Sequence, residues 1–245
     1  MKLSGHTILI TGGSEGIGFA LANSLAQDNQ VLICSRSEQK LQQAKQQCAS
    51  LIPYRCDLTD PKQRHSMIKD IVKSYPKLNI LINNAGAKRF SNLADIQSVS
   101  DALHKDFAIN FQAPALLCSE LLNHLKTKPL GAIINISSGL IHIPKAEQAF
   151  YCAAKSALHS YNQSLRWVLK SSNVKVFEAI LPLVDTQFHH QKLPQNISAI
   201  QPVTAAQKIL QGIRQDKDQI YVGKAILAYW LSLFMFKTAM KMINR

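Results

Sequence analysis

The sequence Thr11-Gly12-Gly13-Ser14-Glu15-Gly16-Ile17-Gly18 lies between an apolar run, Thr7–Thr11, and a stretch with helical spacing that begins near Gly16. Strand, glycine loop and helix in this order form a site for a diphosphate at the helix N-terminus. Gly12 permits the tight turn, Gly16 lets the backbone approach the phosphates, and Gly18 allows the helix to pack closely on the strand. The segment therefore predicts a dinucleotide-binding loop.

Apolar runs alternate with amphipathic stretches along most of the chain. Runs that are apolar at nearly every position predict strands covered on both faces, and they lie at residues 7–11, 31–35, 51–56, 78–83, 132–137 and 174–181, with a final one at 219–222. Stretches with helical spacing lie at residues 16–28, 37–49, 60–74, 98–127 and 149–171. This alternation predicts an α/β fold, a Rossmann-like doubly wound parallel sheet in a three-layer α/β/α arrangement. No linker or repeat divides the chain, so we expect a single domain over residues 1–245.

The composition is that of a globular chain. With 245 residues, of which 47% are hydrophobic and 18% charged, neither a disordered nor a fibrous protein is expected. The five cysteines form no C-x-x-C pair and are expected to be free thiols in a reducing compartment. The first residues lack the apolar region of a signal peptide, so we expect a cytoplasmic location.

The chain is strongly basic, with 28 Lys and Arg against 15 Asp and Glu and a formal net charge of +13. This charge favours an anionic partner, and a phosphorylated cofactor, an acidic membrane surface and nucleic acid all satisfy it. Dense Lys/Arg runs interleaved with aromatic residues, which are typical of nucleic-acid binding, do not occur. We therefore expect no nucleic-acid partner.

The second predicted strand ends in Cys34-Ser35-Arg36-Ser37, where dinucleotide-binding proteins select between NAD and NADP. A carboxylate there binds the ribose hydroxyl of NAD, whereas a guanidinium can hold the 2′-phosphate of NADP. Arg36 therefore favours NADP(H). Glu15 lies close by in the loop, so NAD(H) or dual use stays open, as does a solvated surface charge for Arg36.

Two further segments follow predicted strands at the same edge of the sheet. Asp57, in Cys56-Asp57-Leu58-Thr59, can accept a hydrogen bond from an adenine amino group. The alternative is a cap for the helix that starts near Pro61, although Asp60 is better placed for that role. Asn83-Asn84-Ala85-Gly86 ends the fourth strand, and its small residues and amides suit a wall against the adenosine ribose.

The most specific chemical pattern is Tyr151-Cys152-Ala153-Ala154-Lys155, at the start of a long predicted helix. Residues four apart lie on one helix face, so the lysine ammonium stands one turn from the phenol. A fixed cation nearby, together with the positive charge of an oxidised nicotinamide, favours the phenolate over the phenol, whose pKa is ordinarily about 10. Tyr151 can then exchange a proton with a substrate oxygen, although Tyr and Lys at this spacing are also common as a structural pair.

Ser138 ends the fifth predicted strand, and Asn110 lies in the helical stretch before that strand. Ser137 is a competing candidate, but it alternates with Ser138 across the strand and should face the opposite side. Over nearly the whole chain, order and spacing resemble those of the short-chain dehydrogenase/reductase family. The residues that carry this resemblance are the glycine loop, Asp57, Asn83-Asn84-Ala85-Gly86, Asn110, Ser138, Tyr151 and Lys155.

The resemblance implies an active nicotinamide-dependent oxidoreductase. Hydride would pass between the nicotinamide and a small-molecule carbonyl or secondary alcohol, with Tyr151 as general acid/base and Ser138 on the substrate oxygen. The resemblance also implies that Lys155 binds the nicotinamide ribose and that Asn110 holds a water in a proton relay. The alternative is a dinucleotide-binding sensor or scaffold without turnover, which a missing serine, tyrosine or lysine would favour, and none is missing.

Further segments resemble the DltE-like branch of the family, namely Ser138-Gly139-Leu140, residues 151–161 and Leu181-Pro182-Leu183-Val184-Asp185-Thr186. Most of the family carries Pro-Gly where this chain has Pro182-Leu183, so the leucine adds bulk near the nicotinamide carboxamide. Thr186 and the backbone at Val184 should still reach that carboxamide.

The resemblance and the loop chemistry together give two sets of expected ligand-contacting residues. The residues expected to contact the cofactor are Gly12, Ser14, Glu15, Gly16, Ile17, Gly18, Arg36, Asp57, Leu58, Asn84, Ala85, Gly86, Tyr151, Lys155, Pro182, Val184 and Thr186. Those expected to line an apolar substrate pocket are Leu140, His142, Ile143, Phe150 and Leu183. For His142 an ordinary core or loop role is the alternative.

Residues 187–201 follow the sixth strand and show little periodicity. A loop at this place can cover a substrate, and a plain surface loop is the alternative. His189 and His190 have no metal-ligand partners at convincing spacing, so no metal is expected.

The last apolar run, residues 225–236, is too short to span a bilayer as a helix. Lys237, Lys241 and Arg245 follow it at four-residue spacing. An amphipathic helix lying on the inner membrane surface stays open, as does a helix packed on its own domain or on a second subunit. A homodimer or homotetramer is usual for proteins that this chain resembles.

Overall fold

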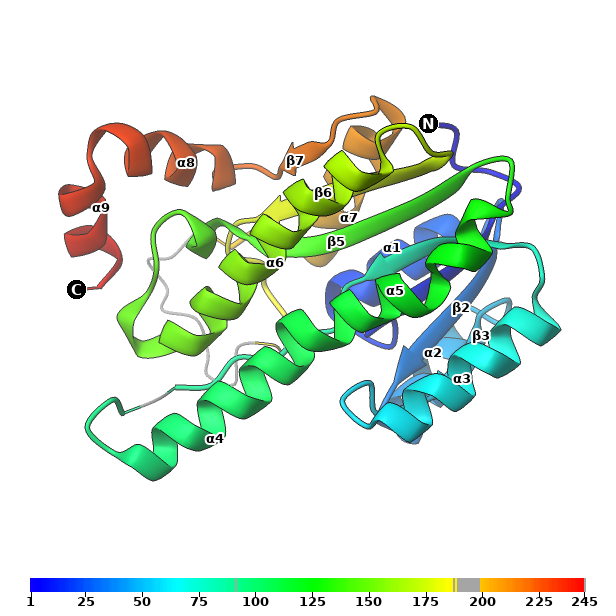
Figure 1. The fold of residues 1–245 in the computed structure, drawn as a ribbon, viewed down its shortest axis with the longest axis horizontal. Helices are drawn as coiled ribbons and strands as arrows, with labels where there is room; N and C mark the ends of the chain where they lie inside the picture. The colour runs from blue at the N-terminus through cyan, green and yellow to red at the C-terminus, as the bar shows by residue number, and fades with distance from the viewer. Residues whose placement is uncertain (91, 187, 189–198, 245) are drawn as a thin grey trace.

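Within the described residues, 1–90, 92–186, 188 and 199–244, the computed structural model contains one seven-stranded sheet (Figure 1). The strand order is β3-β2-β1-β4-β5-β6-β7, and every adjacent pair runs parallel. The strands are β1 Thr7–Thr11, β2 Gln30–Ser35, β3 Ile52–Arg55, β4 Leu78–Asn83, β5 Gly131–Ser138, β6 Val174–Leu181 and β7 Gln219–Tyr221. The expected doubly wound parallel sheet is confirmed.

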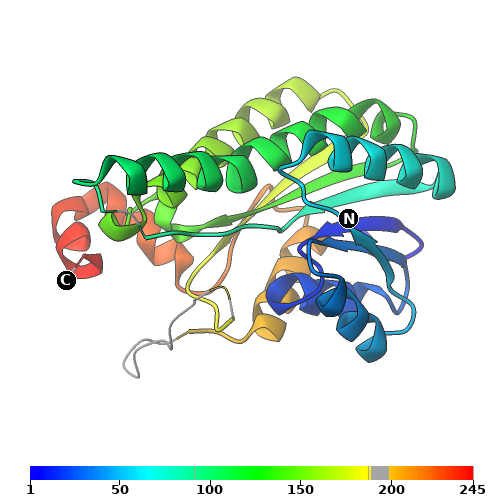
Figure 2. The ribbon, with the colours of Figure 1, turned by 90° about the horizontal axis from the view of Figure 1, so that it is seen from below.

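Helices cover both faces of the sheet (Figure 2). One face carries α1 (Gly16–Leu25), α2 (Glu38–Gln47) and α7 (Pro202–Arg214), and the other carries α3 (Pro61–Ser74), α5 (Ala113–Lys126) and α6 (Ala149–Leu169). Each face has its own apolar core. Ile8 and Ile10 of β1 enter one core and Leu9 enters the other, because side chains alternate along a strand. Burial on both faces is the reason that the strands are apolar at almost every position.

The helical stretch expected at residues 98–127 is not one helix. It consists of α4 (Ile96–Phe107), a π-helical turn η1 (Ala108–Gln112) and α5. Pro114, in the first turn of α5, has no amide to donate to the carbonyl of Asn110, so a regular α-helical ladder is interrupted there. The expectation of a continuous helix is therefore wrong at its centre.

The C-terminal part differs from expectation in two places. The sequence analysis predicts no helix where α7 connects β6 to β7, although residues 205, 206, 209, 210 and 213 are apolar, buried and helically spaced. The apolar run at 225–236 is divided, because α8 (Ala225–Phe234) ends and the chain turns at Met235 into α9 (Phe236–Ile243). None of the helices in the described part of the chain combines the length and apolar character that a bilayer crossing needs.

The expected substrate loop at residues 187–201 lies outside the described residues, except for Phe188 and residues 199–201.

Candidate active site

The glycine loop and the end of β4 meet where the strand order of the sheet changes direction. β1 pairs with β2 on one side and with β4 on the other, and ligands of such sheets bind in the crevice at the carboxyl ends of these strands. The Thr11 hydroxyl accepts hydrogen bonds from the amides of Asn84 and Ala85, at 2.9 and 3.0 Å. The Asn84 side chain donates to the carbonyls of Thr11 and Gly12. These bonds fasten the two segments to each other.

Backbone conformation explains why the loop is rich in glycine. Gly12 and Gly16 have φ angles of +63° and +55°, which residues with a side chain rarely adopt. A Cβ at Gly18 would lie 2.1 Å from the Gly12 carbonyl oxygen, so α1 approaches the turn only without a side chain there. The Glu15 side chain makes no capping hydrogen bond to α1, which leaves the first helical amides for an anion. This bare backbone cradle fits a diphosphate.

The segment after β6 lies against the same loop. A Cβ at Gly16 would meet the Thr186 side chain at 3.2 Å, so two of the segments expected to contact the cofactor are adjacent. Val184 forms a parallel bridge with Ile200, and this bridge uses the amide and carbonyl of the residues flanking Val184. The amide and carbonyl of Val184 itself therefore lie on the opposite edge of the backbone, where a ligand can use them.

At the end of β2, Arg36 is exposed and Glu15 is paired with Lys40. The Lys40 ammonium lies 2.7 Å from a Glu15 carboxylate oxygen, so the charge that argues for NAD(H) is offset by a cation. Lys40 lies in the first turn of α2, four residues beyond Arg36. Lys40 is not among the residues predicted to contact the cofactor, and its only sequence signal is its position at the start of the second helix.

Asp57 does not cap the helix that follows it. One of its carboxylate oxygens accepts from the amide and hydroxyl of Thr59, at 2.9 and 2.7 Å. Asp60 instead caps α3 by accepting from the first amides of that helix. The capping alternative for Asp57 is therefore wrong. Leu58 has a buried side chain, and its carbonyl accepts from the buried Arg64 side chain.

Ser138, Tyr151 and Lys155 converge at the carboxyl end of β5. Ser138 is the last residue of that strand, and the other two lie four apart on α6. The Ser138 side chain lies close enough to the Tyr151 phenol to lower its pKa, and the Lys155 ammonium donates to the Ile136 carbonyl at 2.8 Å. Ser137 is buried, and its hydroxyl finds no partner among the described residues. Ser138 is thus the serine that reaches the phenol.

Gly86 and Asn110 lie beside the same lysine. A Cβ at Gly86 would stand 2.9 Å from the Asn110 side-chain oxygen and 3.8 Å from the Lys155 ammonium. The Asn110 side chain donates to the carbonyls of Ala87, at 2.7 Å, and Asp106, at 2.9 Å, and accepts from the Ala87 amide at 3.3 Å. Asn110 therefore fixes the loop after β4 on the π-helical turn, and all four residues expected to be catalytic are brought together.

Burial dominates the electrostatics of Tyr151 and Lys155. It raises the pKa of Tyr151 above its ordinary value, against a lowering effect of the hydrogen bond from Ser138. It lowers the pKa of Lys155 to about 8, opposed by the attraction of the Glu178 carboxylate. The expected phenolate depends on the positive charge of an oxidised nicotinamide as well as on the lysine, so it stays a prediction. Without that charge, burial is the largest influence on the pKa of Tyr151. Tyr151 therefore carries its proton at neutral pH.

Two fully buried carboxylates beside these residues, each next to a basic side chain, are not predicted from the sequence. The fully buried Asp106 lies 2.7 Å from the Arg89 guanidinium, and burial raises the pKa of Asp106 in spite of that cation. The fully buried Glu178 lies 2.9 Å from the Nδ1 of His159, one turn beyond Lys155 on α6. A carboxylate within the apolar β6 strand is a sequence signal for the second pair.

His142 is held by an aromatic cluster. Its Nε2 lies 3.2 Å from the Tyr221 hydroxyl, and its ring centre lies 5.8, 5.2 and 6.0 Å from those of Tyr221, Tyr229 and His159. Burial lowers the pKa of His142. These contacts favour the structural alternative for this residue. Of the other residues expected to line the substrate pocket, Ile143 is buried and Leu140, Phe150 and Leu183 are half-buried.

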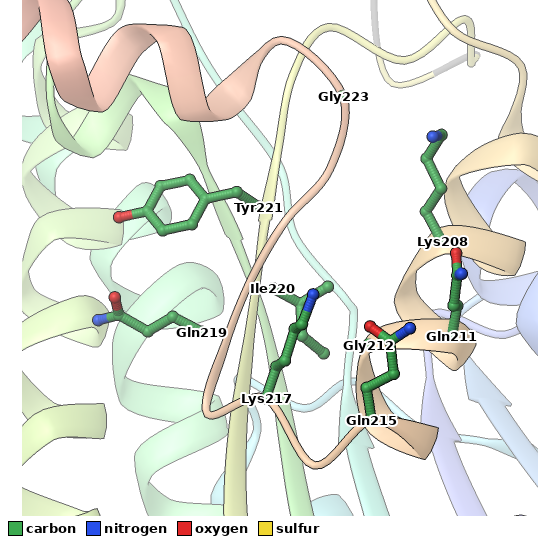
Figure 3. A pocket seen from close by; sticks show the side chains of 9 residues that line it. All are labelled: Lys208, Gln211, Gly212, Gln215, Lys217, Gln219, Ile220, Tyr221 and Gly223. Carbon is green, nitrogen blue, oxygen red and sulfur yellow. The ribbon is translucent and has the colours of Figure 1, made fainter.

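Two cavities lined by described residues lie outside this group. One of about 270 Å³ is lined by Lys208, Gln211 and Gln215 from α7 and the region of β7 (Figure 3). Tyr221 points away from α7 there, toward His142. The other, of about 370 Å³, lies between α6 and α9. Neither is lined by Ser138, Tyr151 or Lys155. Among the described residues, no three His, Cys, Asp or Glu side chains gather as metal ligands would, and His189 and His190 lie outside that set.

Comparison with known proteins agrees with this geometry. The profile of the short chain dehydrogenase family matches residues 6–197. A Bacillus subtilis protein named uncharacterized oxidoreductase DltE is 38% identical over 227 residues, which cover 90% of this chain and 89% of that protein. The resemblance to the DltE-like branch is confirmed by this relative.

Solved structures show the same fold. A short chain dehydrogenase from Burkholderia cenocepacia in complex with NADP has a TM-score of 0.85 at 21% identity, covering 100% of both chains. A short chain dehydrogenase/reductase from Burkholderia phymatum in complex with NAD has a TM-score of 0.83 at 17% identity, covering 100% of this chain and 97% of that one. With the family profile over most of its length and a close relative over nine-tenths of it, the chain belongs to the short-chain dehydrogenase/reductase family and is one of its oxidoreductases.

Proposed function

We propose that this oxidoreductase transfers hydride between NADP(H) and a carbonyl or secondary-alcohol substrate, with Tyr151 as general acid/base. The observation that carries the proposal is the meeting of the Ser138 hydroxyl, the Tyr151 phenol and the Lys155 side chain at the end of β5. The segment after β4 connects this group to the glycine loop, because Asn84 bonds that loop and Gly86 lies against Lys155. Proton donor and diphosphate cradle are therefore parts of one site.

The preference for NADP(H) rests on the corner at the end of β2. Arg36 is free to face solvent there, and Glu15 is neutralised by Lys40. A guanidinium binds a phosphate with two parallel hydrogen bonds, which the hydroxyl of NAD(H) cannot match. The proteins of similar fold hold NADP in one case and NAD in the other, so they favour neither cofactor. The proposal ranks NAD(H) as the weaker cofactor because of Arg36 and Lys40.

A protonated Tyr151 is the form that carbonyl reduction requires. When bound, the reduced nicotinamide supplies the hydride, and the oxidised form accepts it in the reverse direction. The Ser138 hydroxyl donates to the substrate oxygen and orients it, and Tyr151 gives that oxygen its phenolic proton as negative charge develops. Lys155 then stabilises the phenolate, and Asn110 holds the adjoining backbone in register. Because burial raises the pKa of Tyr151, the phenol is in the donor form when the reaction begins.

A sensor or scaffold without turnover is the second candidate, and the filled catalytic positions argue against it. The substrate pocket, the cytoplasmic location and assembly as a homodimer or homotetramer stay predictions from the sequence. So does the extent of the single domain over residues 1–245.

The test compares the wild type with Tyr151→Phe on a panel of ketones, aldehydes and secondary alcohols, each with NADPH and with NADH. Removing the proton donor is expected to lower kcat by at least about 10²-fold, whereas NADPH affinity, measured by fluorescence titration, is retained. Tyr161→Phe is the matched control, because Tyr161 lies on the same helix but packs on Phe111, and it is expected to keep wild-type turnover.

Three outcomes separate the candidates. Equal turnover by Tyr151→Phe and the wild type would refute the role of Tyr151. NADPH binding by a wild type that turns over no substrate of the panel would favour the sensor. A lower kcat/KM with NADPH than with NADH would overturn the cofactor preference while leaving the chemistry intact.

A further inference from the structure

The two C-terminal helices lie at one end of the molecule (Figures 1 and 2), and they expose large apolar side chains. We call these residues the C-terminal apolar face: Leu227, Trp230, Leu233, Phe234, Met235 and Phe236, each close to half exposed or more. Trp230 is 50% and Phe234 is 77% exposed, and their rings stack at 6.1 Å between centroids. Globular monomers seldom leave a contiguous patch of this kind uncovered without a use for it.

Exposed lysines flank this face in the sequence. Lys224 precedes α8, and Lys237 and Lys241 lie one turn apart on α9, all three exposed. The chain has no Asp or Glu after Asp218. The C-terminal apolar face is therefore bordered by positive charge without a carboxylate from the same segment to balance it.

This charge distribution decides between two occupants. Two-fold packing on a second copy would place this basic face against an equally basic face, and residues 219–244 contain no Asp or Glu to offset that charge. An anionic bilayer satisfies both features, because its headgroups attract the lysines and its interfacial region accepts apolar and Trp side chains. We propose that α8 and α9 form a surface that binds an anionic membrane peripherally, without spanning it.

The helices that carry this face are attached to the catalytic end of the protein. A Cβ at Gly139, next to Ser138, would lie 3.7 Å from the Ala228 side chain of α8. Asn244, after α9, accepts from the Ala146 amide at 2.6 Å and donates to the Pro144 carbonyl. Both contacts fall on the segment that joins Ser138 to Tyr151, so membrane binding holds that side of the site next to the lipid. The proposal does not require Tyr151 to be catalytic.

The first measurement is co-sedimentation of the full-length protein with vesicles of phosphatidylcholine, with and without phosphatidylglycerol. Binding is expected only with the anionic lipid and is expected to weaken as salt is added. The chain has two tryptophans, so a Trp167→Phe background leaves Trp230 as the sole reporter. Its emission is expected to shift to shorter wavelength on binding.

Three variants assign the binding to this surface. Lys237→Gln with Lys241→Gln is expected to lower vesicle affinity about 30-fold, since each cation near an anionic surface contributes about 1 kcal/mol. Trp230→Ser with Phe234→Ser is expected to abolish binding. The matched control, Trp167→Ser with Val168→Ser on α6, removes side chains that are 71% and 72% exposed and is expected to bind as the wild type does.

Two results would overturn the proposal. One is the same sedimentation with neutral and with anionic vesicles, or with neither. The other is a change of oligomeric state in light scattering: the wild type is a dimer and the double variant Trp230→Ser with Phe234→Ser is a monomer. That result would assign the face to a second copy. Circular dichroism checks that each variant is folded. If the Trp230/Phe234 double variant is not folded, the Lys237/Lys241 double variant still tests the proposal.

Discussion

Lys155 is a buried cation, and the shift of its pKa measures how much its charge destabilises the folded state. Burial lowers the pKa from 10.5 to about 8, which corresponds to roughly 3 kcal/mol of destabilisation below pH 8. Between about pH 8 and pH 10.5 the unfolded chain binds the proton that the folded chain has released. The contribution of Lys155 to the free energy of unfolding therefore rises with pH between about pH 8 and pH 10.5.

Replacing this lysine should separate stability from activity. Lys155→Met removes the buried charge but also the hydrogen bond to Ile136, which contributes about 1 kcal/mol. We expect the variant to be about 2 kcal/mol more stable than the wild type in urea unfolding at pH 7, and to lose this advantage by pH 10.5. Its turnover should be almost lost. The exposed Lys69→Met should change stability by less than about 0.5 kcal/mol. A variant less stable than the wild type at pH 7 would mean that the ammonium is well paired in the fold.

Arg36 controls cofactor choice in the proposed function. Charged hydrogen bonds to a phosphate contribute about 1.5–3 kcal/mol, so Arg36→Ala should lower kcat/KM with NADPH about 10- to 100-fold. The value with NADH should hardly change, because the hydroxyl that replaces the phosphate gains little from a guanidinium. Arg55→Ala, an exposed arginine at the end of β3, is the control. Equal losses with both cofactors would show that Arg36 acts on the loop and not on the phosphate.

At the scale of elements, two glycines in helices differ in what a methyl group would meet. A Cβ at Gly18 of α1 meets backbone, the Gly12 carbonyl at 2.1 Å, whereas one at Gly212 of α7 meets only the Ile220 side chain, at 2.5–2.9 Å. Backbone cannot move without opening the turn, but a side chain can be shortened. Gly18→Ala should therefore lower the free energy of unfolding by about 3 kcal/mol or more and weaken NADPH binding.

Gly212→Ala should cost about 1–3 kcal/mol, and adding Ile220→Val should recover part of that loss, because the two residues touch. Urea unfolding of the four proteins measures both effects, and NADPH titration checks the loop. Recovery at Gly212 together with unaltered NADPH affinity in Gly18→Ala would contradict the account of the glycine cradle.

Local chemistry determines which elements the sequence can predict. The strands are recognisable because burial on both faces makes them apolar throughout. Spacing places Tyr151 and Lys155 on one helix face, but their roles and that of Ser138 follow from the family resemblance. The break at Asn110 has a local signal that the predicted helix over residues 98–127 does not take into account: Pro114 lacks the amide that would bond the Asn110 carbonyl. The partners in the pairs Asp106–Arg89 and Glu178–His159 depend on how distant segments pack. Only Glu178, a carboxylate within an apolar strand, gives a local signal.

At the scale of the whole molecule, topology explains why some distant residues could be placed together in advance. Parallel strands end at one edge of the sheet, so the loops after β1, β4 and β5 had to meet once the doubly wound order was recognised. The surroundings of His142 could not be foreseen in the same way. Its partners Tyr221 and Tyr229 come from β7 and α8, whose positions follow from α7, a helix the sequence analysis does not predict.

The charge of the whole molecule leads to the last prediction. A net charge of +13 attracts NADPH more strongly than NADH, because the additional phosphate carries nearly two negative charges. Salt shortens the Debye length from about 30 Å at 0.01 M to about 8 Å at 0.15 M, so kcat/KM with NADPH should fall on the order of tenfold over this range. The fall with NADH should be clearly smaller. In Arg36→Ala a shallower but measurable dependence should persist, since that residue supplies one charge of many. Parallel salt dependences for the two cofactors would mean that the field of the protein does not steer the phosphate.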